Sequence, residues 1–283
     1  MAELASDSTE LFHGLPCRCL RLPNGDSLRV VLHGAQVLSW VTGGRERLYL
    51  SPRSHFDGKA AIRGGVPICF PQFNQRGPLP KHGFARNLPW LADGPPALSE
   101  QAAELTLRLP ASDATRLFWP QSFEATLNLC LRPASLQMTL GVRNTGQTPL
   151  SFTGALHTYL AVKDISAVQL DGLHGQPEWD ALIDQHSRVS GALSFQDEFD
   201  RVYGAAAHAL ILHDGSSHLK IEQSPSFANT VVWNPGAKKG AMLPDLPAAG
   251  YAHMLCVEAA QVMQPVTVEA GAQWQGWQRL SVL

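Results

Sequence analysis

Apolar and polar residues alternate along most of the chain, which is the pattern of β-strands that bury one face. In residues 123–131 the apolar positions are odd-numbered, and in 136–142 they are even-numbered. The two segments predict a hairpin that turns at Arg132-Pro-Ala-Ser. Residues 27–41 predict two strands separated at Gly34. Further strands are predicted at 48–50, 105–109, 151–162, 167–170, 209–212, 219–223, 230–233, 254–257, 266–268 and 277–282.

Helical periodicity is weak throughout, and we find no amphipathic helix longer than about three turns. The chain has no internal repeat and no low-complexity linker of the kind that separates domains. Large β-sandwiches commonly reach 283 residues undivided. We therefore predict an all-β fold, a large antiparallel β-sandwich, with residues 1–283 as a single domain.

Composition and charge narrow the range of partners. The chain is 45% hydrophobic and 16% charged, with a formal net charge of −2. Its charges are scattered without runs, so neither nucleic acid nor a membrane is an expected partner. The N-terminus lacks the pattern of a secretory signal, and the five cysteines suit reduced thiols. We expect a cytoplasmic, monomeric protein that binds a small molecule.

The segment 61–86 has neither a helical nor a strand period, and it predicts a shaped loop. Its Gly-Gly pair at 64–65 allows positive φ and a close approach of the backbone to a ligand. Arg63, Lys81 and Arg86 suit an anionic or hydroxyl-rich ligand, because guanidinium groups bind phosphate in a fixed plane. The alternative is an ordered structural loop whose arginines bind backbone carbonyl groups.

His157 lies on the predicted strand 151–162, on a small and semi-polar face that it shares with Thr153 and Tyr159. If that face lines a cleft, the imidazole can carry a proton in either direction near neutral pH. The alternative is a core histidine that is satisfied by hydrogen bonds.

Glu258 interrupts an apolar strand pattern, on the same face as Cys256 and Ala260. A carboxylate in such a position must be paired, hydrogen-bonded or raised in pKa, because desolvating an isolated charge is costly. The alternatives are that this face is exposed at the strand end, or that Glu258 pairs with an arginine.

Two aspartates and a cysteine pair are weaker candidates for a binding site. Asp200 and Asp245 have carboxylates that could bind a ligand, but both occupy what look like ordinary loop positions. The Cys17-Arg-Cys19 pair has no second pair at zinc spacing, and the chain has no nucleotide-binding or zinc-protease motif. We expect no metal and no cofactor.

Six ordered motifs resemble those of the hexose-6-phosphate mutarotases (glucose-6-phosphate 1-epimerases), within the aldose 1-epimerase-like superfamily. These motifs are Arg63-Gly-Gly-Val-Pro with Phe70-Pro-Gln-Phe, His82-Gly-Phe-Ala-Arg86, Leu156-His-Thr-Tyr-Leu, Gly172-Leu-His-Gly, Asp200-Arg-Val-Tyr and Cys256-Val-Glu258. The resemblance covers nearly the whole chain. It implies a galactose mutarotase-like β-sandwich with an open concave sheet that holds the sugar.

The resemblance also implies roles for individual residues. It makes His157 the general acid and Glu258 the general base. The predicted substrate-binding residues are Arg63, Gln72, Lys81, His82, Arg86 and Asp200. Lys81 departs from the glutamine that similar proteins carry before the His-Gly pair, which leaves its hydrogen-bonding role open but adds a cation.

The chemistry of anomer exchange suits this pair of residues. The reaction removes the proton from the C1 hydroxyl, protonates the ring oxygen, opens the ring to the aldehyde, rotates about C1–C2 and closes on the other face. One acid and one base suffice. The leading hypothesis is anomer exchange of a hexose 6-phosphate, with glucose 6-phosphate first, because the loop cations favour a phosphate. The alternatives are a mutarotase for neutral aldoses and a sugar-binding protein without turnover.

Overall fold

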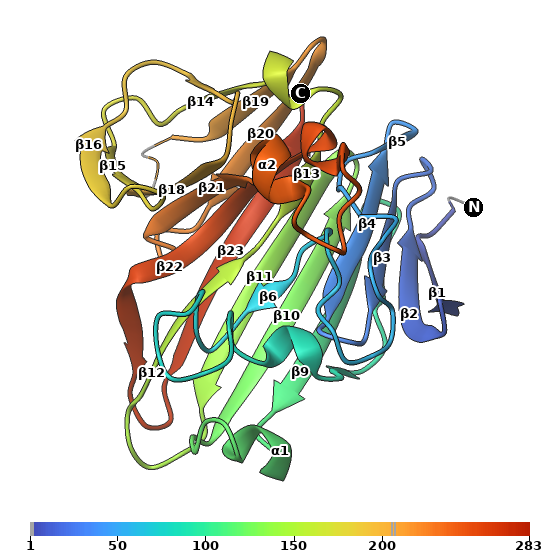
Figure 1. Ribbon diagram of the computed structural model, residues 1–283. Helices are drawn as coiled ribbons and strands as arrows, with labels where there is room; N and C mark the ends of the chain where they lie inside the picture. The colour runs from blue at the N-terminus through green and yellow to red at the C-terminus, as the bar shows by residue number, and fades with distance from the viewer. Residues whose placement is uncertain (1–2, 205, 207) are drawn as a thin grey trace.

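The computed structural model describes residues 3–204, 206 and 208–283. Within these residues the named strands form three sheets and pair antiparallel, and the helices are short (Figure 1). The helices are α1 (Asp113–Arg116), α2 (Gly236–Gly240) and the 3-10 turns η1 (Ala85–Asn87), η2 (Ile165–Ala167) and η3 (Gly250–His253). None of the helices in the described residues is long and apolar enough to cross a bilayer. The predicted all-β class is confirmed.

The largest sheet of the described residues has ten strands, and its long central strands alternate buried and half-exposed residues. Its strands are β7 (Leu91–Ala92), β8 (Ala97–Leu98), β9 (Ala103–Pro110), β10 (Phe123–Arg132), β11 (Ser135–Asn144), β14 (Gln169–Asp171), β17 (Leu193–Ser194), β19 (Leu210–Asp214), β20 (Ser217–Gln223) and β23 (Gln273–Val282). The β10–β11 hairpin pairs Leu131 with Leu136, so the predicted hairpin is confirmed.

The second sheet has eight strands in the described part of the chain, and it carries the candidate site. Its strands are β6 (Ile68–Cys69), β12 (Leu150–Leu156), β13 (Tyr159–Ala161), β15 (Pro177–Asp180), β16 (Gln185–Arg188), β18 (Phe199–Gly204), β21 (Asn229–Asn234) and β22 (Met254–Val268). The predicted continuous strand 151–162 is wrong, because the chain turns at His157. There the backbone N–H of Thr158 donates to the carbonyl of Leu156 over 3.0 Å.

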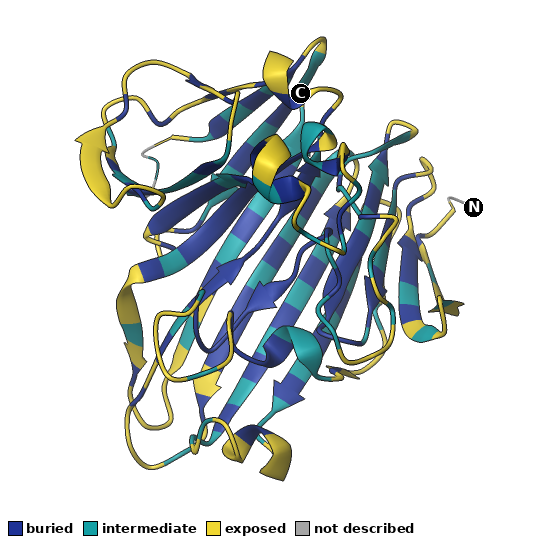
Figure 2. Cartoon of the chain, in the orientation of Figure 1, coloured by how far each residue is buried: buried dark blue, intermediate teal, exposed yellow. Residues whose placement is uncertain are grey.

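Strand β22 corrects a second prediction, because segments 254–257 and 266–268 belong to one strand. Its pairing with β12 is irregular. Leu150 and Phe152 pair with Val268 and Val266, but the register shifts before Gly154, which pairs with Gln261. The first half of β22 is buried and the second half is largely exposed, as its change from dark blue to yellow in Figure 2 shows. Asp200 was predicted in a loop, but it lies within β18.

A third sheet of five strands forms the N-terminal part of the described chain. Its strands are β1 (Ser6–Phe12), β2 (Leu15–Arg21), β3 (Ser27–Val31), β4 (Gln36–Thr42) and β5 (Arg45–Glu46). The strands on either side of Gly34 were predicted, whereas β1 was missed because most of its residues are exposed and do not alternate. The predicted strand 48–50 forms only isolated bridges, from Leu48 to Leu160 and from Leu50 to Gly64.

The two large sheets share one hydrophobic core. Leu129 and Leu280 of the ten-stranded sheet belong to the same buried cluster as Leu156 and Val257 of the eight-stranded sheet. Close packing of this kind fixes the two sheets face to face. The opposite face of the eight-stranded sheet carries separate, smaller clusters, one of them around Val231 and Ala260. That second face is where the chain places its unusual polar residues.

Candidate active site

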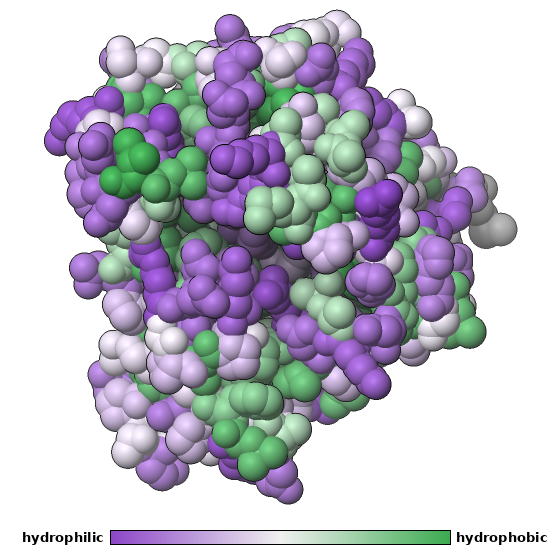
Figure 3. All heavy atoms as spheres, in the orientation of Figure 1, coloured by the Kyte–Doolittle hydropathy of each residue, from purple (hydrophilic) through white to green (hydrophobic). Residues whose placement is uncertain are grey.

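A pocket lies on the face of the eight-stranded sheet that points away from the core. It has a water-accessible volume of about 120 Å³. The residues that line it are Arg63, Phe73, Asn74, Lys81, His82, His157, Asp200, Val231, Trp233, Lys239, Leu243 and Glu258. In the view of Figure 1 the loop 61–86 and helix α2 lie in front of the sheet, and Figure 3 shows hydrophilic residues around a hollow at the centre of this face.

Strand register brings the central residues of the pocket together. Val231 of β21 pairs with Glu258 of β22, and Asp200 of β18 pairs with Trp233 of β21. On the other side of β22, Leu156 pairs with Ala259 and Tyr159 pairs with Cys256. His157 therefore stands opposite Glu258, at the point where the chain turns between β12 and β13.

His157 and Glu258 form a buried pair at the base of the pocket. The imidazole Nε2 lies 3.4 Å from the carboxylate Oε1, and the two residues are 7% and 1% exposed. Within the described residues, His157 Nδ1 and Glu258 Oε2 are buried and have no hydrogen-bond partner. Buried polar atoms are almost always paired, so two such atoms on one pair mark a place where a polar ligand fits. Neither the exposed-strand nor the arginine-pair alternative for Glu258 holds.

The environment shifts the pKa of both residues toward the neutral form. Burial raises the pKa of Glu258 well above its ordinary range, and the nearby Asp200 carboxylate raises it further. Burial lowers the pKa of His157 to about 3, with additional repulsion from Arg86 and Arg63. Both shifts favour the neutral forms, and transfer of a proton from Glu258 to His157, whose nearest atoms lie 3.4 Å apart, would give a carboxylate and an imidazolium.

Arg63 is held by a network behind the histidine. Its Nε and Nη2 each donate to the Asp245 carboxylate over 3.1 Å, and its Nη1 donates to the Tyr159 hydroxyl over 3.1 Å. The Tyr159 ring stacks on the His157 ring at a centroid distance of 4.8 Å. The sequence placed Asp245 in an ordinary loop, and no sequence signal pairs it with Arg63. The three residues together hold the orientation of the histidine.

His82 presents a fixed N–H group near His157. Its Nδ1 accepts a hydrogen bond from the backbone N–H of Asn74 over 3.3 Å and lies 3.1 Å from Cys69 Sγ. Because Nδ1 accepts, the proton of the neutral ring lies on Nε2. Burial, followed by repulsion from His157, lowers the pKa of His82 far below its ordinary value, so the ring stays neutral. His82 also has a φ of 64°, an uncommon conformation that the surrounding structure must stabilise.

Two residues predicted to contact the substrate, Gln72 and Arg86, have hydrogen-bond partners within the loop. Gln72 is buried and lies outside the set of pocket-lining residues; its Nε2 donates to the carbonyl groups of Asn74 and Leu79, each over 3.0 Å. The Arg86 Nη2 donates to the Lys81 carbonyl over 2.9 Å, which fits the structural alternative for the loop. Arg86 nevertheless lies close enough to the pair to lower the pKa of His157.

The glycine pair at 64–65 corrects an expectation. Both residues have positive φ, but the groups that approach them belong to the protein's own backbone. A Cβ on Gly64 would lie 2.3 Å from the Tyr49 carbonyl oxygen, and one on Gly65 would lie 2.0 Å from the Val37 carbonyl oxygen. The pair therefore packs the loop against the strands rather than against a ligand.

Sequence analysis missed several pocket residues. Lys239 projects from the short helix α2, which has no periodic signal, and Asn74, Leu243 and Phe73 lie outside regular elements. Trp233 was visible as one of seven tryptophans but was not singled out. Among the described residues, no group of three or more His, Cys, Asp or Glu side chains could hold a metal ion.

The sequence matches a known protein family and several named relatives. The family model for aldose 1-epimerase matches residues 18–281. A relative from Cenchrus ciliaris, provisionally named glucose-6-phosphate 1-epimerase, is 39% identical over 284 residues, covering 95% of this chain and 85% of the relative. An Escherichia coli protein with the same provisional name is 37% identical over 250 residues, covering 85% of this chain and 82% of the relative.

Solved structures of other proteins share the fold of this chain. The provisionally named mutarotase YeaD from Salmonella typhimurium superposes with a TM-score of 0.90 at 31% identity, covering 98% of this chain and 93% of that one. A galactose mutarotase related enzyme from Lactobacillus acidophilus shares the fold, with a TM-score of 0.75 at 14% identity, over 98% of this chain and 97% of that one.

The fold and the family match define an isomerase that acts on sugars. The match over nearly the whole chain makes the identification specific: the chain belongs to the aldose 1-epimerase family. The family resemblance predicted from the sequence motifs is therefore confirmed.

Proposed function

We propose that this enzyme interconverts the α and β anomers of a hexose 6-phosphate, with glucose 6-phosphate as the first candidate. The observation that carries the proposal is the buried His157–Glu258 pair, whose nitrogen and oxygen lie 3.4 Å apart at the base of a pocket with cations at its rim. The provisional names of the relatives from Cenchrus ciliaris and Escherichia coli support the phosphorylated substrate.

In the proposed mechanism the proton of Glu258 first passes to His157, and the Glu258 carboxylate then accepts the proton of the C1 hydroxyl while the His157 imidazolium donates a proton to the ring oxygen. The C1–O5 bond then breaks, the C1–O1 bond becomes the aldehyde carbonyl, and rotation about C1–C2 exposes the other face. Closure reverses both proton transfers, so the enzyme returns to its starting protonation state. Asp200 and the Nε2–H of His82 are proposed to bind sugar hydroxyl groups beside the pair.

The phosphate contributes to this mechanism through charge. Arg86, Arg63 and Lys81 lower the pKa of His157 and so oppose the imidazolium that must form. A phosphate dianion beside these cations would offset their repulsion and favour protonation of His157. Phosphate binding and proton transfer are therefore coupled in the proposal, which gives a phosphorylated sugar an advantage over a neutral one.

Measurement of anomer exchange by NMR tests the proposal, with glucose 6-phosphate, glucose and galactose as parallel substrates. We expect the largest kcat/KM for glucose 6-phosphate. Faster exchange of a free sugar would favour the alternative, a mutarotase for neutral aldoses. One observation favours that alternative: the Arg63 guanidinium is already paired with the Asp245 carboxylate.

We also propose a cytoplasmic location and a monomeric state. All five cysteines are free thiols, which suits a reducing compartment. Cell fractionation and light scattering test these two proposals.

A further inference from the structure

Helix α2 fixes the position of a lysine beside the pocket. Gly236, at its start, has a φ of 61°, and a Cβ there would lie 2.5 Å from the backbone nitrogen of Glu198. The N–H of Gly236 donates to Asn234 Oδ1 over 2.7 Å, and Asn234 Nδ2 donates to the carbonyl of Met254 over 2.8 Å. The helix is thus attached to β21, β22 and the segment before β18. Its position is set by the sheet that carries the acid–base pair.

Lys239 of α2 and Lys81 of the loop 61–86 both line the pocket. The Lys239 ammonium pairs with the Glu198 carboxylate, whereas no carboxylate of the described residues lies within ion-pair distance of the Lys81 ammonium. Partial desolvation lowers the pKa of Lys81, and repulsion from Lys239 is the next cause, followed by Arg86 and Arg63. The rim therefore holds a group of like charges that are only partly compensated by carboxylates.

The ion pair between Lys239 and Glu198 is easily exchanged. The two side chains are 44% and 29% exposed, and exposed ion pairs contribute little to stability. A dianion that approaches Lys239 would therefore replace Glu198 at low cost. By contrast, the Arg63 guanidinium is engaged by both Asp245 and Tyr159.

The polar residues at the base of the pocket are much less exposed than the lysines at its rim. His157 and Glu258 are 7% and 1% exposed at the base, whereas Lys81 is exposed and Lys239 is half-exposed at the rim. A hexose whose C1 and ring oxygen contact the base directs its C6 substituent away from it. A phosphate on C6 then reaches the lysines.

We propose that Lys239 determines specificity for the phosphate, which it binds together with Lys81, while Glu198 serves as its counter-ion when no phosphate is present. The inference rests on the proposed function and adds two residues, Lys239 and Glu198, that the sequence did not single out. The two lysines belong to separate segments, so both contacts form only when the loop 61–86 and α2 are correctly placed.

The test compares Lys239→Ala with Lys238→Ala, since Lys238 is the adjacent lysine on the same helix but is exposed and outside the pocket. The readout is the ratio of kcat/KM for glucose 6-phosphate to kcat/KM for glucose. We expect Lys239→Ala to lower this ratio about tenfold, the effect of losing one hydrogen bond between charged groups. Lys238→Ala should leave the ratio within about twofold of the wild type, because it changes only a solvated charge.

A second variant, Glu198→Gln, keeps the shape of the side chain and removes the competing charge. We expect it to maintain or raise the ratio, because Lys239 is then released for the phosphate. A lower ratio in this variant would overturn the role of Glu198 as an exchangeable counter-ion. An unchanged ratio for Lys239→Ala, with a wild type that prefers glucose 6-phosphate, would overturn the role of Lys239 alone. A wild type that prefers glucose would overturn the proposed function itself.

Discussion

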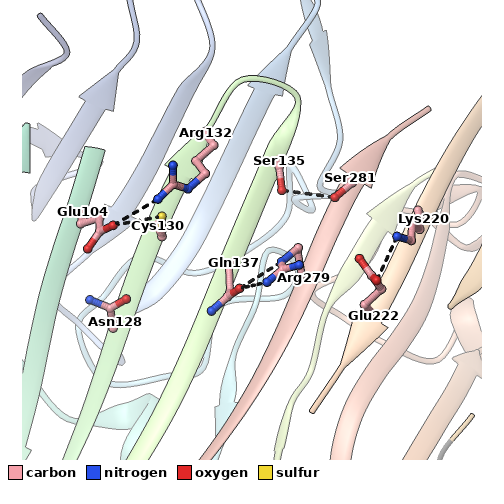
Figure 4. Close-up of a pocket in the computed structure, with 10 residues that line it drawn as sticks. All are labelled: Glu104, Asn128, Cys130, Arg132, Ser135, Gln137, Lys220, Glu222, Arg279 and Ser281. Carbon is pink, nitrogen blue, oxygen red and sulfur yellow. Dashed lines mark hydrogen bonds and ion pairs between the residues drawn. The ribbon is translucent and has the colours of Figure 1, made fainter. Parts of the chain in front are cut away.

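Two polar pockets on opposite sides of the molecule differ in how their charged groups are paired. The outer face of the ten-stranded sheet carries the larger one, with a water-accessible volume of about 690 Å³ against about 120 Å³ for the active-site pocket. Figure 4 shows most of its lining side chains paired with one another. Arg279 Nη2 donates to Gln137 Oε1 over 2.7 Å, and the Lys220 ammonium lies 2.9 Å from Glu222 Oε1.

The active-site pocket shows the opposite arrangement. Its deepest polar atoms, His157 Nδ1 and Glu258 Oε2, are buried and have no hydrogen-bond partner in the described residues. In the same part of the chain, the residues that line the outer pocket contribute no buried side-chain nitrogen or oxygen that lacks a partner. Exposed charges that pair with one another are the ordinary state of a solvated sheet face. Unpaired buried groups are costly and persist where a ligand or a reaction requires them. Pairing therefore distinguishes these two pockets better than their size does.

The largest effect should come from removing the carboxylate of the buried pair. We expect Glu258→Gln to lower kcat by at least about a hundredfold, because general base catalysis is lost while the shape is kept. The matched control is Glu222→Gln in the outer pocket, which should leave kcat unchanged. His157→Asn should have an effect similar to that of Glu258→Gln, and the double variant should lose little more, because the two residues act as a unit. Near-normal anomer exchange in Glu258→Gln would remove it from the mechanism.

A smaller effect should come from removing Arg86, whose charge acts on His157 of the buried pair. We expect Arg86→Ala to weaken the binding of glucose 6-phosphate by about 1.5–3 kcal/mol, the scale of a hydrogen bond to a charged group. The loss for glucose should be much smaller. Arg132→Ala in the outer pocket is the control and should affect neither substrate. Equal losses on both sugars would mean that Arg86 braces the loop through its 2.9 Å contact with the Lys81 carbonyl.

Disrupting the hydrogen-bond network of Arg63, Asp245 and Tyr159 should affect phosphorylated and free sugars equally. Asp245→Asn keeps the shape but removes the charge that holds Arg63, so we expect kcat to fall about tenfold for phosphorylated and free sugars alike, with little change in KM. The acidic limb of the pH–rate profile should also shift, because the released guanidinium changes the field at His157. A loss confined to glucose 6-phosphate would instead place Arg63 at the phosphate.

The smallest effect concerns stability. Because its pKa is raised on folding, Glu258 stabilises the folded protein below its unfolded pKa of about 4.3, and this contribution is lost as pH rises toward the folded pKa. Glu258→Gln removes this dependence. We expect its Tm to exceed that of the wild type by about 2 °C or more at pH 8 and by less at pH 5. Glu222→Gln should show no such pH dependence.

The fold could be predicted from the sequence wherever strands alternate cleanly. The β10–β11 hairpin was predicted correctly because both strands bury one face. Strand β22 was divided in two, because the stretch between its apolar segments includes exposed residues such as Gln264 and Pro265. The strand 151–162 was predicted as continuous, because a turn at one histidine leaves no trace in the hydrophobic pattern.

The site was predictable only in part, because chemistry can be read from residue types but pairing cannot. His157 and Glu258 were recognised as misplaced polar residues, and the structure brings them together through strand register. Asp245 and Lys239 lie on surface segments with no periodic signal, so their contacts depend on long-range folding. Gln72 was included from its motif, whereas its amide is used within the loop. That residues 1–283 form one domain remains a prediction.

The register shift between β12 and β22 determines which residue of β22 lies opposite His157. If the pairing of Leu150 with Val268 and Phe152 with Val266 continued without interruption, His157 would stand opposite Gln261. The extra residues that β22 accommodates between Gln261 and Val266 place Glu258 there instead. Regular pairing of the same residues would preserve both strands, yet it would place the amide of Gln261 where the titratable carboxylate of Glu258 now lies. The residue that faces His157 is thus set partly by an irregularity in strand pairing that lies outside the pocket.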